Sequence, residues 1–416
     1  MTPEMKGFLV LSVVKLVGLF TMLMTGVALL TLMERKVSAW MQNRRGPNRV
    51  GFAGLLQPAA DGLKNFLKEE TYPAEANRAL FVLAPALAFI PALLLSAVIP
   101  FAAPLPLDFD VTLGPLGEFA YHGPLPMVVA DLPVGFLFVL AISSVGVYGI
   151  ALAGWSSNSK YSLLGGLRAS AQMISYEVAM GLSLVPVLLL AGNVSFSAII
   201  RAQQTGLWYV LPLFLSFFVF LISGFAETNR LPFDLPEAES ELVAGYHTEY
   251  SAMKFSMFFI AEYANVVTVC AMVVTLFFGG WDIPWWRDER GGLLHTLATA
   301  LFFFAKVMAW IFFVMWIRWT LPRFRYDQLM SLGWKFLTPL ALVYLMIVCS
   351  AVYLLEQVAG VADVRTRQWC LFGLNAGLAV VVFYVLDRGV LLSGGERRTR
   401  RPAAAPARPI RVGLGG

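Results

Sequence analysis

The chain has 416 residues, of which 58% are hydrophobic and only 14% are charged, and its mean hydropathy is +0.71. Because a soluble domain has about a quarter charged residues, this composition excludes a soluble enzyme. The net charge of +5 is expected to report membrane topology rather than nucleic-acid binding. The three cysteines lie in apolar runs without CxxC spacing, and only three histidines occur. We therefore predict no disulfide, no metal site and no cofactor held by this chain.

Apolar stretches of about 20 residues, the length that crosses a bilayer core, occur nine times. They predict an all-α polytopic membrane protein with about nine transmembrane helices in one domain, residues 1–395. The first stretch is too long for a signal peptide and lacks a cleavage site. The predicted spans are residues 8–33, 79–101, 127–153, 173–192, 208–226, 253–278, 297–321, 336–355 and 369–392.

Lys and Arg residues are distributed unequally between the two sides of these spans. One side holds the first long loop and the C-terminal tail with most of the basic residues, and the other keeps only six. By the positive-inside rule, the N-terminus is outside and the C-terminus is cytoplasmic. Residues 396–416, rich in Arg, Pro, Ala and Gly, are predicted to be a disordered basic cytoplasmic tail. The enrichment in Arg, Ala and Gly favours a bacterial source and thus the cytoplasmic (inner) membrane.

The first polar loop, residues 34–70, contains a basic turn at residues 44–49 followed by apolar residues at helical spacing. This pattern predicts an amphipathic helix on the membrane surface, whose role could be simple anchoring. Asp61 lies beside the apolar stripe, where a carboxylate needs a partner or a wet cavity. Lys64 or Arg35 could be that partner.

Residues 226–250 form an acidic stretch with a single basic residue, Arg230. Glu237 and Glu241 are four residues apart, so on a helix they would repel each other and titrate together. The stretch could be a solvated acidic loop, but the interleaved apolar residues favour a segment that folds against protein. Its carboxylates are Glu227, Asp234, Glu237, Glu239, Glu241 and Glu249.

A third polar stretch, residues 318–339, is basic and aromatic and could be an interfacial anchor with positive-inside charges. The chain contains neither GxGxxG nor GxxxxGK[ST], so no nucleotide-binding loop is predicted.

Ionisable residues also fall inside the predicted spans, where a charge costs roughly 2.5 to 3.5 kcal/mol at the bilayer centre. They are Lys15, Asp131, Glu177, Glu262 and Lys306. Two interpretations stay open: a relay that passes protons toward the middle of the membrane, or fixed ion pairs between helices.

Several motifs together resemble one family, the membrane subunit that forms the quinone tunnel of respiratory complex I. This family is called the H subunit in bacteria and subunit 1 in mitochondria. The resemblance covers roughly residues 13–355, and its motifs are long and ordered. The motifs are Glu34-Arg35-Lys36, RGPN at residues 45–48, LQPAAD at 56–61, Ser175-Tyr176-Glu177, residues 226–250 and RFRYDQL at 323–329.

The resemblance implies a subunit of a proton-translocating NADH:quinone oxidoreductase, with no complete active site of its own. It implies that quinone is the substrate, and that FMN and iron–sulfur clusters belong to partner subunits. The implied partners are peripheral iron–sulfur and quinone-site subunits and antiporter-like and small membrane-arm subunits. Carried over by position, the quinone-tunnel residues are Arg35, Gln57, Asp61, Lys64, Phe66, Phe233 and Arg325. The proton-coupling acids are Asp61, Asp131, Glu177, Glu227, Asp234, Glu237, Glu239, Glu241, Glu249 and Glu262, with Lys306 as an intramembrane base.

Two features depart from the commoner shape of this family: the ninth span and the basic tail. Two other functions compete with complex I. The membrane anchor of an energy-conserving hydrogenase or formate hydrogenlyase shares the fold, whereas a secondary cation/proton transporter would explain the intramembrane charges. A transporter would not explain the long acidic loop.

Overall fold

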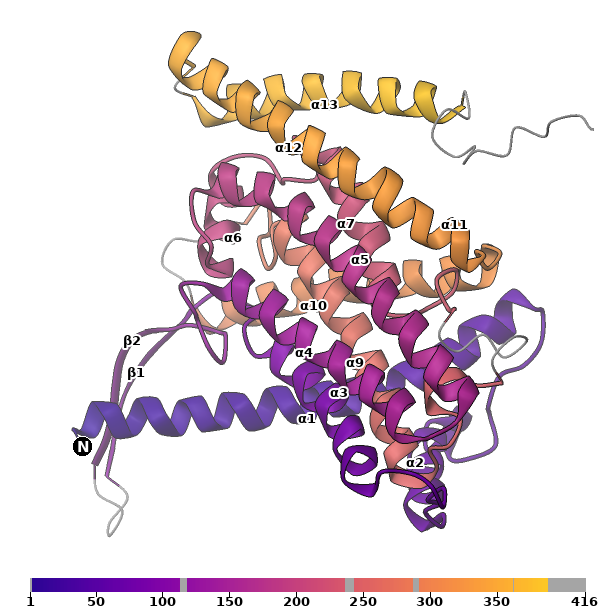
Figure 1. The fold of residues 1–416 in the computed structure, drawn as a ribbon. Helices are drawn as coiled ribbons and strands as arrows, with labels where there is room; N and C mark the ends of the chain where they lie inside the picture. The colour runs from indigo at the N-terminus through magenta and orange to yellow at the C-terminus, as the bar shows by residue number, and fades with distance from the viewer. Residues whose placement is uncertain (1, 113–117, 236–242, 287–291, 362, 388–416) are drawn as a thin grey trace, which may run out of the picture.

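The computed structural model describes residues 2–112, 118–235, 243–286, 292–361 and 363–387, and it is mainly helical (Figure 1). Within these residues, eight helices are long and apolar enough to cross a membrane, which confirms a polytopic all-α protein. They are α1 (Pro3–Met41), α3 (Arg78–Ser96), α4 (Gly135–Ser156), α5 (Lys160–Ala191), α9 (Ala252–Phe277), α10 (Leu293–Thr320), the continuous helix Tyr326–Val358 and α13 (Val364–Asp387). The helix Tyr326–Val358 consists of α11 (Tyr326–Ser331), α12 (Thr338–Tyr353) and two π-helical turns.

The predicted fifth span is only partly helical. Helix α7 (Phe214–Glu227) has 14 residues, which is about 21 Å and less than a bilayer core of about 30 Å. Before it, the Leu207 N–H donates to Gln368 Oε1 at 2.6 Å, and Gln203 Oε1 joins this non-helical segment to the end of α9. The Tyr209 and Gly279 N–H groups donate to Gln203 Oε1 at 3.2 and 3.0 Å. Gln203 lies on the short helix α6 (Phe196–Thr205).

A β-hairpin, which the sequence analysis did not predict, projects beside the N-terminal half of α1. Strands β1 (Leu105–Thr112) and β2 (Glu118–Leu125) pair antiparallel. A Cβ atom on Gly7 would lie 2.2 Å from the Ala120 carbonyl oxygen, so only glycine allows this close approach. Next to the hairpin, Lys15 Nζ donates to the Pro126 and Val128 carbonyls at 3.1 and 2.8 Å, so this intramembrane base is held by backbone oxygens.

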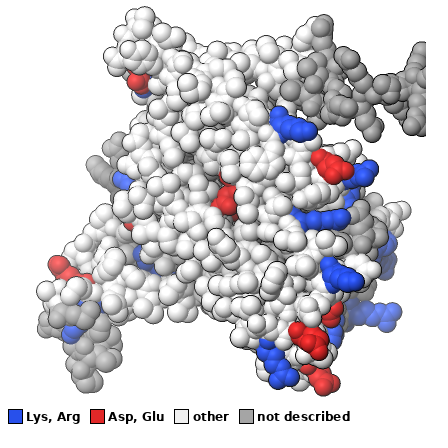
Figure 2. Space-filling view, in the orientation of Figure 1, with Lys and Arg blue, Asp and Glu red and all other residues white. Residues whose placement is uncertain are grey.

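The predicted surface helix is present as α2 (Gln57–Leu67), which confirms that element. None of its residues is buried, and Leu63 and Phe66 are 60% and 71% exposed. Figure 2 shows charged side chains concentrated at the side of the molecule where α2 lies, whereas the centre of this face is uncharged apart from one acidic residue.

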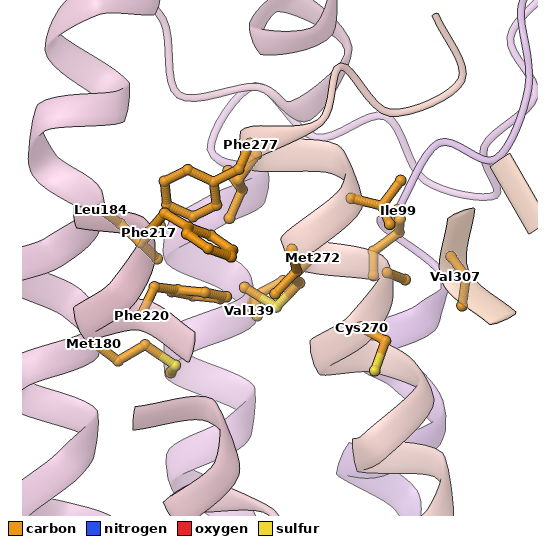
Figure 3. Packing of buried hydrophobic residues seen from close by; sticks show 14 of the residues in the cluster. Ile99, Val139, Met180, Leu184, Phe217, Phe220, Cys270, Met272, Phe277 and Val307 are labelled. Carbon is orange, nitrogen blue, oxygen red and sulfur yellow. The ribbon is translucent and has the colours of Figure 1, made fainter. Parts of the chain in front are cut away.

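The hydrophobic core joins α5, α7 and α9 (Figure 3). Phe217 of α7 packs edge-on against Phe277 of α9, with ring centroids 5.4 Å apart, and Leu184 of α5 is fully buried beside them. This packing fixes the N-terminal turns of α7 against α5 and α9.

A candidate coupling site of buried charges

Glu34 is the centre of a buried charged cluster between α1, α9 and α10. Its carboxylate accepts hydrogen bonds from the Tyr263 hydroxyl at 2.6 Å and from Arg230 Nη1 at 3.2 and 3.3 Å. Arg318 forms a further ion pair with it. The side chains of Glu34 and Arg230 are only 9% and 5% exposed, so their charges depend on each other for compensation.

Arg230 connects this cluster to a second acid. Its guanidinium forms ion pairs with both Glu34 and Glu262, and it lies 4.0 Å from the centroid of the Tyr263 ring. Burial alone would lower the pKa of Arg230, but Glu262, Tyr263 and Glu34 raise this pKa above its ordinary value. Arg230 therefore stays charged and is shared between two carboxylates.

Gln172 of α5 fixes the segment that carries Arg230. Its side-chain amide donates to the carbonyls of Ala226 and Phe233, at 2.8 and 2.9 Å, on either side of Arg230. Gln172 is fully buried, as expected for a side chain that satisfies backbone groups away from water. The acidic stretch therefore folds against protein over its described residues.

Glu262 and Glu227 line the same small cavity of about 40 Å³ between α3, α4, α5 and α9. Since one water needs about 10 to 15 Å³ by this measure, the cavity has room for two or three. Asn265, whose Oδ1 atom is buried without a protein partner, also lines it. The two carboxylates therefore border one cavity that is large enough for water.

Ser143 extends the path toward Glu177. It lines the same cavity and donates its hydroxyl to Glu177 Oε1 at 3.2 Å, and Ser144 donates to the same oxygen at 2.6 Å. We call this series of groups the charged chain. It consists of Glu34, Arg230, Glu262, the cavity, Glu227, Ser143 and Glu177.

Three of the five predicted tunnel residues of the first loop meet: Arg35, Gln57 and Asp61. Arg35 Nη1 lies 2.6 Å from Asp61 Oδ2, and Gln57 Nε2 donates to Asp61 Oδ1 at 3.1 Å. Arg35, not Lys64, is therefore the described partner of Asp61. Lys64 and Phe66 are exposed on α2 and belong to its outer surface.

Of the other two predicted tunnel residues, only Phe233 lies in a separate apolar cluster around Tyr176. Phe233 is buried there, 5.6 Å from the Tyr176 ring centroid. Asp234, beside it, accepts from Arg323 at 3.0 Å. Arg325 is 79% exposed and its nearest acid is Asp327 at 3.4 Å, so it lies at the surface, outside the Tyr176 cluster.

Several predicted residues lie away from the charged chain. Asp131 is exposed before the start of α4 and accepts hydrogen bonds from Ser195 and Ser197. Glu249 is half-buried in the loop before α9. Lys306 directs its ammonium at three carbonyl oxygens at 2.8, 2.9 and 3.0 Å, which are those of Phe278, Gly280 and Asp282. Glu237, Glu239 and Glu241 lie outside the described residues.

Four members of the buried cluster were missed as site residues: Glu34, Arg230, Tyr263 and Arg318. Glu34 was assigned to the first loop because the apolar run stops at Met33, but α1 continues to Met41. The apolar residues Val37 and Ala39 continue beyond the apparent end of the span, and this continuation was the sequence signal that could have placed Glu34 inside the protein.

The fold and the charged chain define a multi-pass membrane protein built to hold ionisable groups in its interior. The chain belongs to the NADH dehydrogenase family, whose model matches residues 14–349. It is 52% identical to the H subunit, form 2, of the NADH-quinone oxidoreductase of Koribacter versatilis, over 82% of this chain and 96% of that protein. It is 51% identical to the H subunit, form 1, of Geobacter metallireducens over 80% and 94%. It is 49% identical to NADH-ubiquinone oxidoreductase chain 1 of Chondrus crispus over 82% and 96%.

Proposed function

We propose that this chain is the quinone-tunnel membrane subunit of an NADH:quinone oxidoreductase and that the charged chain couples quinone reduction to proton movement. Relatives about 50% identical over four-fifths of the sequence are named as subunits of that enzyme. The group Arg35, Gln57 and Asp61 is the proposed mouth of the tunnel. Peripheral subunits would supply FMN and the iron–sulfur clusters, and antiporter-like subunits would receive the coupling signal.

Arg230 is the proposed link between the quinone side and the acids. Two unit charges 4 Å apart interact by about 4 kcal/mol at an effective dielectric constant near 20. A change in charge at Glu34 therefore alters how strongly Arg230 holds Glu262. A more weakly held Glu262 takes up a proton more readily.

Beyond Glu262, the proton can travel by short steps. Water in the 40 Å³ cavity would connect Glu262 with Glu227, and the Ser143 hydroxyl would connect the cavity with Glu177. The observation that carries the proposal is this series of ionisable and hydroxyl groups, which joins α1 to α5 through the loop after α7, α9 and the small cavity.

The variant Glu262→Gln in the intact complex, reconstituted into vesicles, tests the proposal. We expect NADH oxidation with a water-soluble artificial acceptor to stay unchanged and proton pumping per quinone reduced to fall severalfold. Glu75→Gln, which changes an exposed acid in the loop before α3, is the matched control and should pump normally. Normal pumping in the Glu262→Gln complex would contradict the coupling role.

A second experiment tests the partners. The complex is purified gently from its native membrane through a tag on this chain, and the recovered subunits are identified by mass spectrometry. We expect flavin and iron–sulfur subunits. A nickel–iron subunit would select the hydrogenase anchor instead, and recovery of the chain alone would favour a transporter.

A further inference from the structure

An apolar cavity of about 300 Å³ lies between α1, α3, α9 and α10, outside the charged chain. Two of its lining residues, Ile99 and Val307, appear at one side of Figure 3. Among the described residues that line it, only Ser96 and Thr268 are polar and none is charged. A wall of this composition suits a hydrocarbon and offers nothing to a charged headgroup.

The cavity is long and opens sideways. On α1 its lining extends from Leu19 to Met33, which is about 21 Å along a helix and comparable with one hydrocarbon chain in a bilayer core about 30 Å thick. Three lining residues, Met22, Leu29 and Met308, are 44% to 46% exposed. The opening therefore lies between α1 and α10, on the surface that faces lipid.

The inner end of the cavity is closed. Leu30 and Ile311 line it and also line the neighbouring pocket around Glu34, and they are only 4% and 2% exposed. The neighbouring pocket has about 10 Å³ of space, enough for roughly one water. A quinone ring cannot pass through this pocket from the cavity to the Glu34 cluster.

We propose that this cavity binds one acyl chain of a membrane phospholipid, which enters sideways between α1 and α10 while the headgroup stays at the membrane surface. The uncharged wall, the sideways opening and the closed inner end all fit a chain that only needs to be buried. The bound chain restores the contacts that an empty apolar cavity lacks. This inference does not depend on the proposed redox function.

Gly26 provides a specific way to fill the cavity. It lines the wall, and a Cβ atom built on it meets nothing within 4 Å. A leucine at this position would therefore begin in open space on the cavity wall and reduce the volume left for a ligand. Gly18 lies on the same helix with equally open surroundings and does not line the cavity, so Gly18→Leu is the matched control.

The experiment uses the intact complex in vesicles of phosphatidylethanolamine and phosphatidylglycerol containing a phosphatidylethanolamine with a diazirine on one acyl chain. After photolysis, mass spectrometry locates the cross-links. We expect labelling at Met308 and Met22, reduced at least fivefold by Gly26→Leu and unchanged by Gly18→Leu. Undiminished labelling in Gly26→Leu, or none at these residues in the wild type, would overturn the proposal.

A second arm needs no variant and holds even if Gly26→Leu fails to assemble. Wild-type complex is labelled in the same vesicles with and without an excess of long-tailed quinone. Labelling of Met308 and Met22 that the quinone leaves unchanged supports an acyl-chain site. Competition by the quinone, or labelling of Met308 by a quinone with a diazirine in its isoprenoid tail, would show that the cavity binds a quinone tail instead of an acyl chain.

Discussion

Arg230 holds two buried carboxylates, and their dependence on it is unequal. Glu34 has further partners in Arg318 and Tyr263, whereas the described contacts give Glu262 one ion pair, with Arg230. Loss of Arg230 would therefore remove the one described ion pair of Glu262, whereas Glu34 would keep Arg318 and Tyr263. This asymmetry predicts which second substitution should compensate.

Arg230→Met is expected to destabilise the protein by about 3 to 5 kcal/mol, because it leaves a buried carboxylate uncompensated. The measurement is the thermal midpoint and the yield of the assembled complex. Adding Glu262→Gln should restore much of the loss, since it removes the stranded charge. If the stability losses of the two single substitutions simply add in the double variant, Glu262 does not depend on Arg230 for its charge compensation.

His247 predicts a local sensitivity to acid. It packs against Tyr246 and Phe255 in the loop before α9, and burial lowers its pKa from 6.5 to about 4. The unfolded loop therefore binds more protons between pH 6.5 and 4, so stability falls as the pH is lowered through this window. The expected loss at pH 5 is about 2 kcal/mol.

Thermal midpoints of the wild type and of His247→Gln at pH 7 and pH 5 measure this effect. The variant cannot titrate at this position, so its midpoint should drop less between the two pH values. Equal drops in both proteins would show that the imidazole does not resist protonation in the folded loop.

At the scale of elements, apolar length predicted the helices well because a bilayer core demands it. It failed before α7, where the Gln203 side chain accepts from backbone N–H groups. Gln203 and its two targets are 6 and 76 residues apart in the sequence, so no local pattern reveals these bonds. The hairpin was missed because its contact is with the distant α1.

Helix α13 lies beyond the part of the chain that the family model matches, yet it is fastened by a buried polar contact. Asn375 accepts from the Tyr344 hydroxyl at 2.8 Å and donates to the Pro212 carbonyl at 2.6 Å. These bonds join α13 to α12 and to the non-helical start of the fifth span (Figure 1). α13 therefore completes the backbone hydrogen bonding of its neighbours.

Asn375→Leu should destabilise the protein by about 1 to 3 kcal/mol, because the Tyr344 hydroxyl would be left buried without its partner. The thermal midpoint of the complex measures it. The double variant Tyr344→Phe with Asn375→Leu should recover part of the loss, since both polar partners are then removed. Val380→Leu, at a 70% exposed position of α13, is the control and should have no effect. A wild-type midpoint in Asn375→Leu would mean that α13 is not fastened by this contact.

At the scale of the whole molecule, the sequence predicted three of the four acids of the charged chain but neither Glu34 nor the organisation of the groups. Glu177, Glu227 and Glu262 were identified individually, whereas their connection depends on a water-sized cavity formed by four helices. Glu34 and Arg230 are 196 residues apart in the sequence. Such pairing emerges only when α1 and the loop after α7 are brought together in three dimensions.

The uneven distribution of Lys and Arg makes a testable statement about the whole molecule, namely that the N-terminus is outside. Helix α1 has 39 residues, about 58 Å, so its ends extend past both sides of a core about 30 Å thick. With the native cysteines replaced by alanine, Glu4→Cys in right-side-out membrane vesicles should react with an impermeant maleimide. Lys64→Cys, exposed on α2, should react only after permeabilisation. The opposite pattern would place Arg35 and Asp61 outside, where the peripheral subunits of the proposed complex could not reach them.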